Sequence, residues 1–211
     1  MQTSPEEARR ERGMERFLLF SDGVTAIAVT LLVLPLVDAV TETDGSGLDV
    51  LSVLNGMRWE MFSFVLSFAV IVLLWLSHQR IFANVAGYDR VVMWTGITWL
   101  FSIVTLAFST ALIADHGNEQ ATVIIYILNL AVAMGALTFL VSYLARRPAL
   151  LHAGATVDAG DVLDSWINMG LLLLALVLVL VFPGLGFMVM LLLFIDGPVS
   201  RWLARWGGVA G

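Results

Sequence analysis

Long apolar runs separated by short polar segments dominate this chain. The runs cover about residues 17–37, 61–76, 91–114, 121–144, 162–182 and 185–203. Most of them are close to the roughly 20 residues that a helix needs to cross a bilayer core of about 30 Å. The pattern therefore predicts an all-α integral membrane protein with six transmembrane helices. Pro183 and Gly184 mark the break between the last two runs.

The composition agrees with a membrane protein. Hydrophobic residues make up 59% of the chain and charged residues only 13%, against about 25% charged residues in an average soluble domain. The mean hydropathy is +0.91. The chain contains no cysteine, which excludes disulfides, cysteine nucleophiles and thiolate metal sites. We expect one transmembrane domain over residues 1–211, in which residues 1–15 form a polar cytoplasmic tail without a signal peptide.

The arginines predict the orientation of the chain in the plasma membrane. With the N-terminus inside, every arginine except Arg58 falls on a cytoplasmic segment, and the positive-inside rule then assigns both termini to the cytoplasm. The first outer loop, about residues 38–55, is acidic. We favour a solvated loop there, and a mouth that concentrates cations is the alternative.

The first apolar run also carries polar groups, among them Asp22. An ionisable residue within a membrane span is by default a candidate functional residue. On a helical wheel Ile27, Leu31 and Leu34 form one stripe with Thr30 beside it, and Asp22 lies about 140° away from Ile27. The large aliphatic side chains and the Thr30 hydroxyl therefore lie on one face of the helix, and Asp22 lies on another.

Two interpretations of this stripe remain open. An ordinary membrane helix would turn such a face to lipid or to its own bundle. Alternatively, several copies of the helix line a pore, in which rings of aliphatic side chains form a constriction that gates by dewetting. A ring of Thr30 hydroxyls would then offer uncharged oxygen ligands to a cation.

For Asp22 we favour a brace between helices over a direct ion ligand, because of its angle on the wheel. The first span starts inside and the second ends inside, so Asp22 shares its depth with donors near the end of the second run, including Gln79. The expected polar cluster comprises Arg16, Ser21, Asp22, Trp75, His78 and Asn84. We expect His78 to be a hydrogen-bonded brace rather than a proton sensor.

The segment Arg16-x-x-x-Phe20-Ser21-Asp22 resembles the Arg-x-x-x-Phe-Ser-Asp signature of the endolysosomal potassium channel family (transmembrane protein 175) and its prokaryotic relatives. The residues that follow, 23–34, are also similar to the first helix of that family. The six predicted spans and the Trp75-x-x-His78 pair agree with the prokaryotic members. Pro35 and Gln79 depart from the usual pattern, and we expect Pro35 to bend the outer turn.

The resemblance implies a homotetramer whose first helices line a central pore without a re-entrant filter loop. It implies potassium-preferring conduction, with K⁺ as a transient ligand and with no cofactor, bound metal or nucleic acid. The constriction falls on Ile27, Leu31 and Leu34, and the threonine layer on Thr30. The signature residues, including Arg16, Phe20, Ser21 and Asp22, belong to a packing network between helices.

Our leading hypothesis is thus a passive potassium-preferring channel. The alternative is an ion- or proton-coupled secondary transporter that uses Asp22, although no inverted repeat or broken midplane helix is evident. An assembly protein without transport is also compatible with the plain later spans. An enzyme is disfavoured, because His78, His116 and His152 are scattered along the chain and form no catalytic set.

Overall fold

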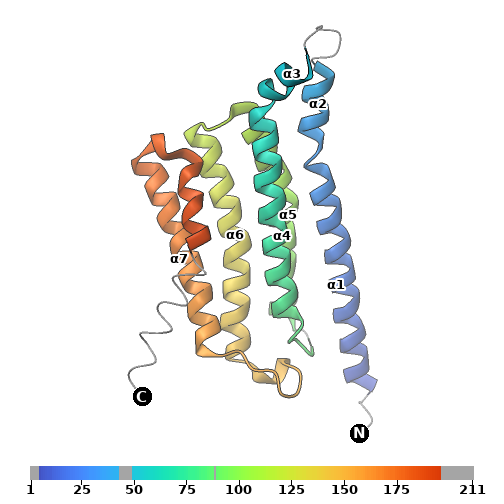
Figure 1. Ribbon diagram of the computed structural model, residues 1–211. Coiled ribbons are helices and arrows are strands. Elements are labelled where there is room, and N and C mark those ends of the chain that lie inside the picture. Colours follow the sequence, from blue (N-terminus) through green and yellow to red (C-terminus); the bar gives the residue numbers. More distant parts are fainter. Residues whose placement is uncertain (1–4, 43–48, 88, 196–211) are drawn as a thin grey trace.

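The protein is an elongated bundle of long helices, seen in a computed structural model that describes residues 5–42, 49–87 and 89–195 (Figure 1). Within these ranges the structure is all-helical. The elements are α1 (Pro5–Leu31), α2 (Leu34–Glu42), α3 (Val50–Gly56), α4 (Arg58–Phe82), α5 (Arg90–His116), α6 (Gln120–Ala145), η1 (Pro148–Leu150), α7 (Ala159–Val181) and η2 (Pro183–Ile195). The predicted fold class is confirmed, and α3 adds a short helix to the expected acidic loop.

Five segments of the described chain are long and apolar enough to cross a membrane. They are α1 with α2 (Arg12–Glu42), α4, α5, α6 and α7. The chain is therefore a multi-pass membrane protein. The predicted sixth span begins in η2 and ends in residues 196–203, which lie outside the described residues, so the number of six spans stays a prediction.

The described part of the sixth run differs from the expected α-helix, since Pro183–Ile195 is a 3₁₀ segment with a kink at Gly186 (φ +49°). The side chain of Asn118 lies against the backbone at this kink. Its Oδ1 accepts a hydrogen bond from the backbone N–H of Phe187 at 2.9 Å, and a Cβ at Gly186 would lie only 2.0 Å from the amide. A residue with a side chain could not adopt this backbone here.

The first helix is longer than the apolar run that predicted it. It begins at Pro5, so most of the expected polar tail is helical. Proline is well suited to a first helical position.

The helix is interrupted at residues 32–33, where α1 gives way to α2. Pro35 has no N–H to donate to the carbonyl of Leu31. The N–H groups of Leu32 and Val33 instead reach the carbonyls three residues before them, at 3.3 Å each. The expected bend at Pro35 therefore has a backbone basis.

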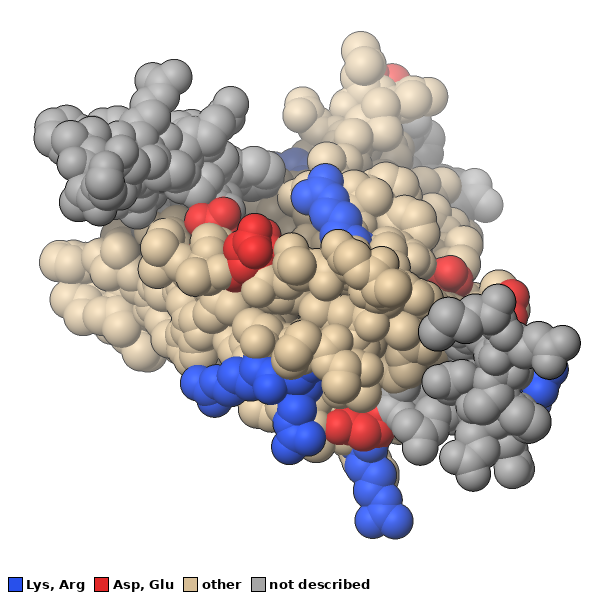
Figure 2. Space-filling model, turned by 90° about the horizontal axis from the view of Figure 1, so that it is seen from below, with Lys and Arg blue, Asp and Glu red and all other residues tan. Residues whose placement is uncertain are grey.

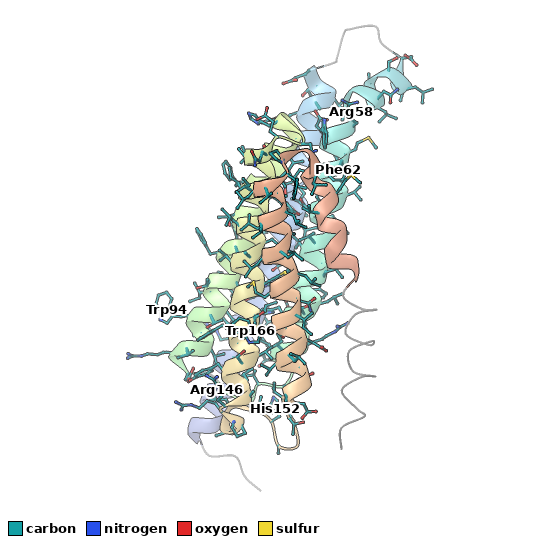
Figure 3. All side chains as sticks on the ribbon, turned by 90° about the vertical axis from the view of Figure 1, so that its left-hand side faces the viewer. Arg58, Phe62, Trp94, Arg146, His152 and Trp166 are labelled. Carbon is teal, nitrogen blue, oxygen red and sulfur yellow. The ribbon has the colours of Figure 1, made fainter. Side chains whose placement is uncertain are left out.

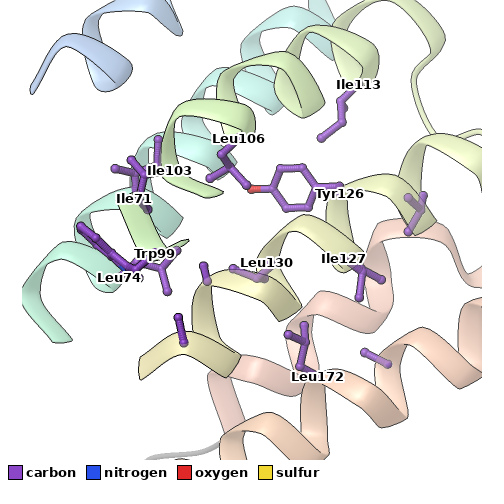
Figure 4. Packing of buried hydrophobic residues seen from close by; sticks show 14 of the residues in the cluster. Ile71, Leu74, Trp99, Ile103, Leu106, Ile113, Tyr126, Ile127, Leu130 and Leu172 are labelled. Atoms are coloured by element: carbon purple, nitrogen blue, oxygen red, sulfur yellow. The ribbon is translucent and has the colours of Figure 1, made fainter. Parts of the chain in front are cut away.

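Helices α5 and α6 form the buried centre of the bundle. Figure 4 shows Tyr126 of α6 between residues of α5, with Trp99 next to Leu74 of α4. Buried hydroxyls tie the three helices together: Thr110 Oγ1 donates to Ser67 Oγ at 2.7 Å, and Ser67 Oγ lies 3.3 Å from the hydroxyl of Tyr126. These polar groups are satisfied within the bundle, as burial requires.

One end of the bundle is rich in arginine. Figure 2 looks onto this end, where arginine side chains project from the molecule. Here Asp89 caps α5 by accepting from the N–H of Val92 at 2.9 Å, and it also accepts a hydrogen bond from the hydroxyl of Tyr143 on α6. Burial raises the pKa of Asp89, but these hydrogen bonds and the nearby Arg147 outweigh burial and hold the pKa below its usual value.

Candidate functional site

Helix α1 packs one face against the bundle. The buried residues of that face are Met14, Ser21, Thr25, Ala28 and Leu32. Their spacings of seven, four, three and four residues keep them on one side of a helix. The face lies against α4 and α5, and α1 stands at the edge of the bundle in Figure 1.

The opposite face of α1, with Leu34 at the start of α2, carries the predicted pore residues. Ile27 is 60% exposed, Leu31 44% and Leu34 50%, and Thr30 is exposed beside them. The Thr30 hydroxyl donates to the carbonyl of Ile27 at 2.8 Å, which leaves its oxygen free to accept or to coordinate. A stripe of large apolar side chains is thus left largely exposed by the part of the chain that the structure describes.

Asp22 lies between these two faces and bonds to α4. Its Oδ1 accepts a hydrogen bond from Trp75 Nε1 at 2.8 Å and another from Gln79 Nε2 at 2.6 Å. Trp75 and Gln79 are one turn apart, so they approach the carboxylate from the same side of α4. The carboxylate links α1 to α4 and is satisfied by neutral donors.

His78 is buried in the same region but makes a different contact. Its ring stacks on Trp99, with centroids 4.0 Å apart and planes at 19°, and lies 4.3 Å from the ring centroid of Phe82. Among the described residues, neither ring nitrogen has a hydrogen-bond partner. The predicted hydrogen-bonded brace is therefore wrong, because His78 shares the buried stripe of Ile71 and Leu74 and faces the core.

Four other residues of the predicted cluster and packing network lie elsewhere. Asn84 follows the end of α4, is exposed, and donates to the carbonyl of Arg80 at 3.2 Å. Arg16 and Phe20 are exposed on α1 because they lie within about 20° of Ile27 on the wheel. Ser21 is buried on the packed face, and its hydroxyl has no partner among the described residues. The structure thus joins Asp22, Trp75 and Gln79, and not the full set.

The sequence pattern did not predict the close contact between α1 and α5. A Cβ at Gly96 of α5 would lie 2.6 Å from the Phe17 ring of α1. The ring in turn lies 6.0 Å from that of Phe82, centroid to centroid. Gly96 is a small residue within an apolar run, and such a residue permits close helix packing. It could have indicated this contact.

The site offers aliphatic side chains and hydroxyls rather than charged ligands. Within the ranges that the structure describes, no three His, Asp or Glu side chains form a group that could hold a metal ion. The arrangement can form an apolar constriction with a hydroxyl layer when copies of α1 face one another, which is chemistry suited to weak, transient cation contact.

This chain is similar to a known protein family and to individual known proteins. Residues 16–106 match the family model described as "Endosomal/lysosomal potassium channel TMEM175". A potassium channel of Streptomyces collinus is 36% identical over 102 residues, 48% of each chain. A potassium channel of Chamaesiphon minutus is 37% identical over 115 residues, 52% of this chain and 54% of that one.

The fold matches over a longer stretch. A crystal structure of a lysosomal potassium-selective channel TMEM175 homolog from Chamaesiphon minutus superposes with a TM-score of 0.66 and 25% identity, covering 92% of this chain and 97% of that one. The resemblance predicted from the first helix is confirmed. In sequence, the chain spans about half the length of the curated relatives that it matches.

Proposed function

From the TMEM175 match of residues 16–106 and the shared fold, we propose that this chain is a subunit of a potassium-preferring cation channel of the plasma membrane. The exposed stripe of α1 is the observation that carries the proposal. It lies within the segment that matches the family, and its side chains remain largely exposed within the described residues. Conduction is passive and needs no cofactor.

The pore forms when four copies bring this stripe to a common axis. Ile27, Leu31 and Leu34 then become stacked apolar rings, and the free oxygens of Thr30 form a layer between them. A narrow apolar ring excludes water and sets the barrier to ions, while hydroxyl oxygens replace part of the hydration shell of a cation. Both ends of the chain lie in the cytoplasm, on the arginine-rich side.

Asp22 holds this stripe in register rather than binding the ion. Its two hydrogen bonds come from α4, and both engage one carboxylate oxygen. The bonds fix the rotation of α1, because a turn of the helix about its axis would break them. Since Trp75 and Gln79 already engage one oxygen of Asp22, we favour a brace over a coupled transporter that would use this carboxylate as an ion site.

Flux into liposomes tests the proposal. Purified protein should pass K⁺ down its gradient with no proton gradient present. Leu31→Ala should raise the flux or lower the preference for K⁺ over Na⁺, because truncation widens the apolar ring. Leu173→Ala, at a comparably exposed leucine of α7, is the matched control and should leave the flux unchanged.

Two results would overturn the channel. Flux that appears only with an imposed proton gradient, and that Asp22→Asn abolishes in a folded protein, would establish a coupled transporter. Equal effects of Leu31→Ala and Leu173→Ala would mean that the α1 stripe faces lipid and that the ion path lies elsewhere.

A further inference from the structure

A groove between α6 and α7 lies at the arginine-rich end of the bundle, away from the proposed pore. Its volume is about 360 Å³. The lining includes Phe139, Ser142 and Arg146 from α6 and Val162, Trp166 and Met169 from α7. In Figure 3 the labels of Arg146 and Trp166 lie toward one end of the molecule and those of Arg58 and Phe62 toward the other.

The groove changes from apolar to polar along its length. Phe139 and Met169 line the part that lies further into the membrane span. Toward the end of α6, Trp166 Nε1 donates to Ser142 Oγ at 3.1 Å, and Arg146 follows one turn after Ser142. This order of apolar wall, polar groups and cation matches the order of acyl chain, glycerol region and phosphate in a phospholipid of the adjacent leaflet.

The two arginines that follow α6 have different surroundings. Arg147 lies over the Tyr143 ring, 5.7 Å from its centroid, whereas Arg146 is exposed at the mouth of the groove. The nearest acids of α7 do not share the helix face that lines the groove. Asp161 and Asp164 lie about 100° and 160° around the helix from Val162. Asp161 also accepts a hydrogen bond from the backbone N–H of Asp158.

We propose that this groove is a binding site for an anionic phospholipid of the arginine-rich leaflet. One acyl chain lies along Phe139 and Met169, and the phosphate meets Arg146 and the groups at Ser142. Helices α1 and α7 stand at opposite edges of the bundle (Figure 1), so a pore lined by α1 leaves the groove on the outer, lipid-facing side. The site requires only the membrane fold, so it does not depend on conduction.

A lipid explains the groove better than the other occupants. A free phosphate would use Arg146 but leave the apolar wall uncovered. A second copy of the chain would have to bring an acid to Arg146, and the stripe available for self-association lies on α1. Basic pockets between helices on the cytoplasmic side are typical sites for anionic head groups.

Native mass spectrometry of the purified protein tests the site. The protein is mixed with phosphatidylglycerol and phosphatidylcholine of identical acyl chains. We expect the wild type to retain phosphatidylglycerol preferentially. Arg146→Gln should lower that preference about fivefold, since one basic residue near the surface contributes about 1 kcal/mol and each 1.4 kcal/mol is about tenfold. Arg146→Lys should keep it.

Arg90→Gln is the matched control, because Arg90 is exposed at the same end but does not line the groove. An unchanged preference in this variant supports the site. Equal retention of both lipids, or full displacement of phosphatidylglycerol by inorganic phosphate, would overturn it. A change of subunit number in Arg146→Gln with no lipid effect would assign the groove to a second copy and also overturn the proposal.

Discussion

At the scale of single residues, Asp22 serves the packing of the first span, whereas the aliphatic Ile27, Leu31 and Leu34 are exposed. Asp22 is satisfied by two neutral donors from α4. Ile27, one and a half turns further on, is largely exposed. A buried carboxylate with good partners stabilises a helix pair, and removing one side leaves the other unpaired.

Removal of the Asp22 carboxylate should therefore weaken the assembly. Asp22→Ala leaves the half-buried Trp75 and Gln79 donors without this acceptor, and a lost hydrogen bond costs about 1 kcal/mol. The fraction of oligomer that survives heating, measured by size-exclusion chromatography, should fall. Asp22→Asn keeps an acceptor oxygen and should lose less. Asp164→Ala, at an exposed acid of α7, should change nothing; an equally stable Asp22→Ala oligomer would refute the brace.

The His78 ring gives a second prediction, because it contributes by stacking. His78→Phe keeps a ring between Trp99 and Phe82 and should preserve or raise thermal stability, since no hydrogen bond to a described residue is lost. His78→Ala opens a cavity and should cost about 2–5 kcal/mol. Unfolding monitored by tryptophan fluorescence separates the two. A large loss in His78→Phe would mean that a ring nitrogen has a partner in the assembly.

At the scale of helices, the orientation of α1 depends on two contacts with different chemistry. Asp22 bonds to α4, and Phe17 packs into the space above Gly96 of α5. The first contact fixes rotation about the helix axis, and the second fixes how closely α1 approaches the bundle. Together they determine which face of α1 remains exposed.

A methyl group at Gly96 should push α1 away from α5. The Phe17 ring cannot retreat easily because Phe82 lies beside it, so Gly96→Ala should destabilise the protein by about 1–3 kcal/mol through overpacking. Gly170→Ala on α7, where a Cβ meets nothing within 4 Å, should be neutral or stabilising. Thermal stability of the two variants in the same detergent tests this, and equal effects would contradict the close approach.

The sequence predicted the helices better than their contacts. Apolar runs identified each span that the structure describes, and Pro35 and Pro183 predicted both breaks, because these signals are local to the backbone. The α1–α4 link through Trp75 followed from shared membrane depth alone. Depth cannot fix rotation, however, so His78 was assigned to the wrong face and Asn84 to a cluster beyond its reach. The proximity of Phe17 to Gly96 depends on helix crossing, which no local pattern encodes.

At the scale of the whole molecule, one subunit leaves its first span largely unpacked. Only 22% of the most apolar window of Arg12–Glu42 is buried, against 50% for α5 and 17% for α7, the span at the other edge of the bundle. A span at the edge of a bundle gains its remaining contacts from lipid or from other copies. The signature segment lies on this span, which favours other copies of the chain as its remaining contacts. The side of the bundle formed by α6 and α7 then faces lipid.

A single cysteine at position 27 can show whether the exposed face of the first span meets lipid or a pore. The chain contains no other cysteine that could react. In a pore lined by α1, Ile27→Cys places a ring of thiols around the ion path, and thiolates bind soft metal ions strongly. Cd²⁺ should then block K⁺ flux through Ile27→Cys, and a chelator should restore it. Leu173→Cys, on the exposed face of α7, should be insensitive, as should the wild type. Block in both variants would point to a lipid-exposed or nonspecific effect, and block in neither would remove Ile27 from the pore. With native mass spectrometry of the same Ile27→Cys sample, four subunits and a complete Cd²⁺ block would together establish that the first helices surround one central axis.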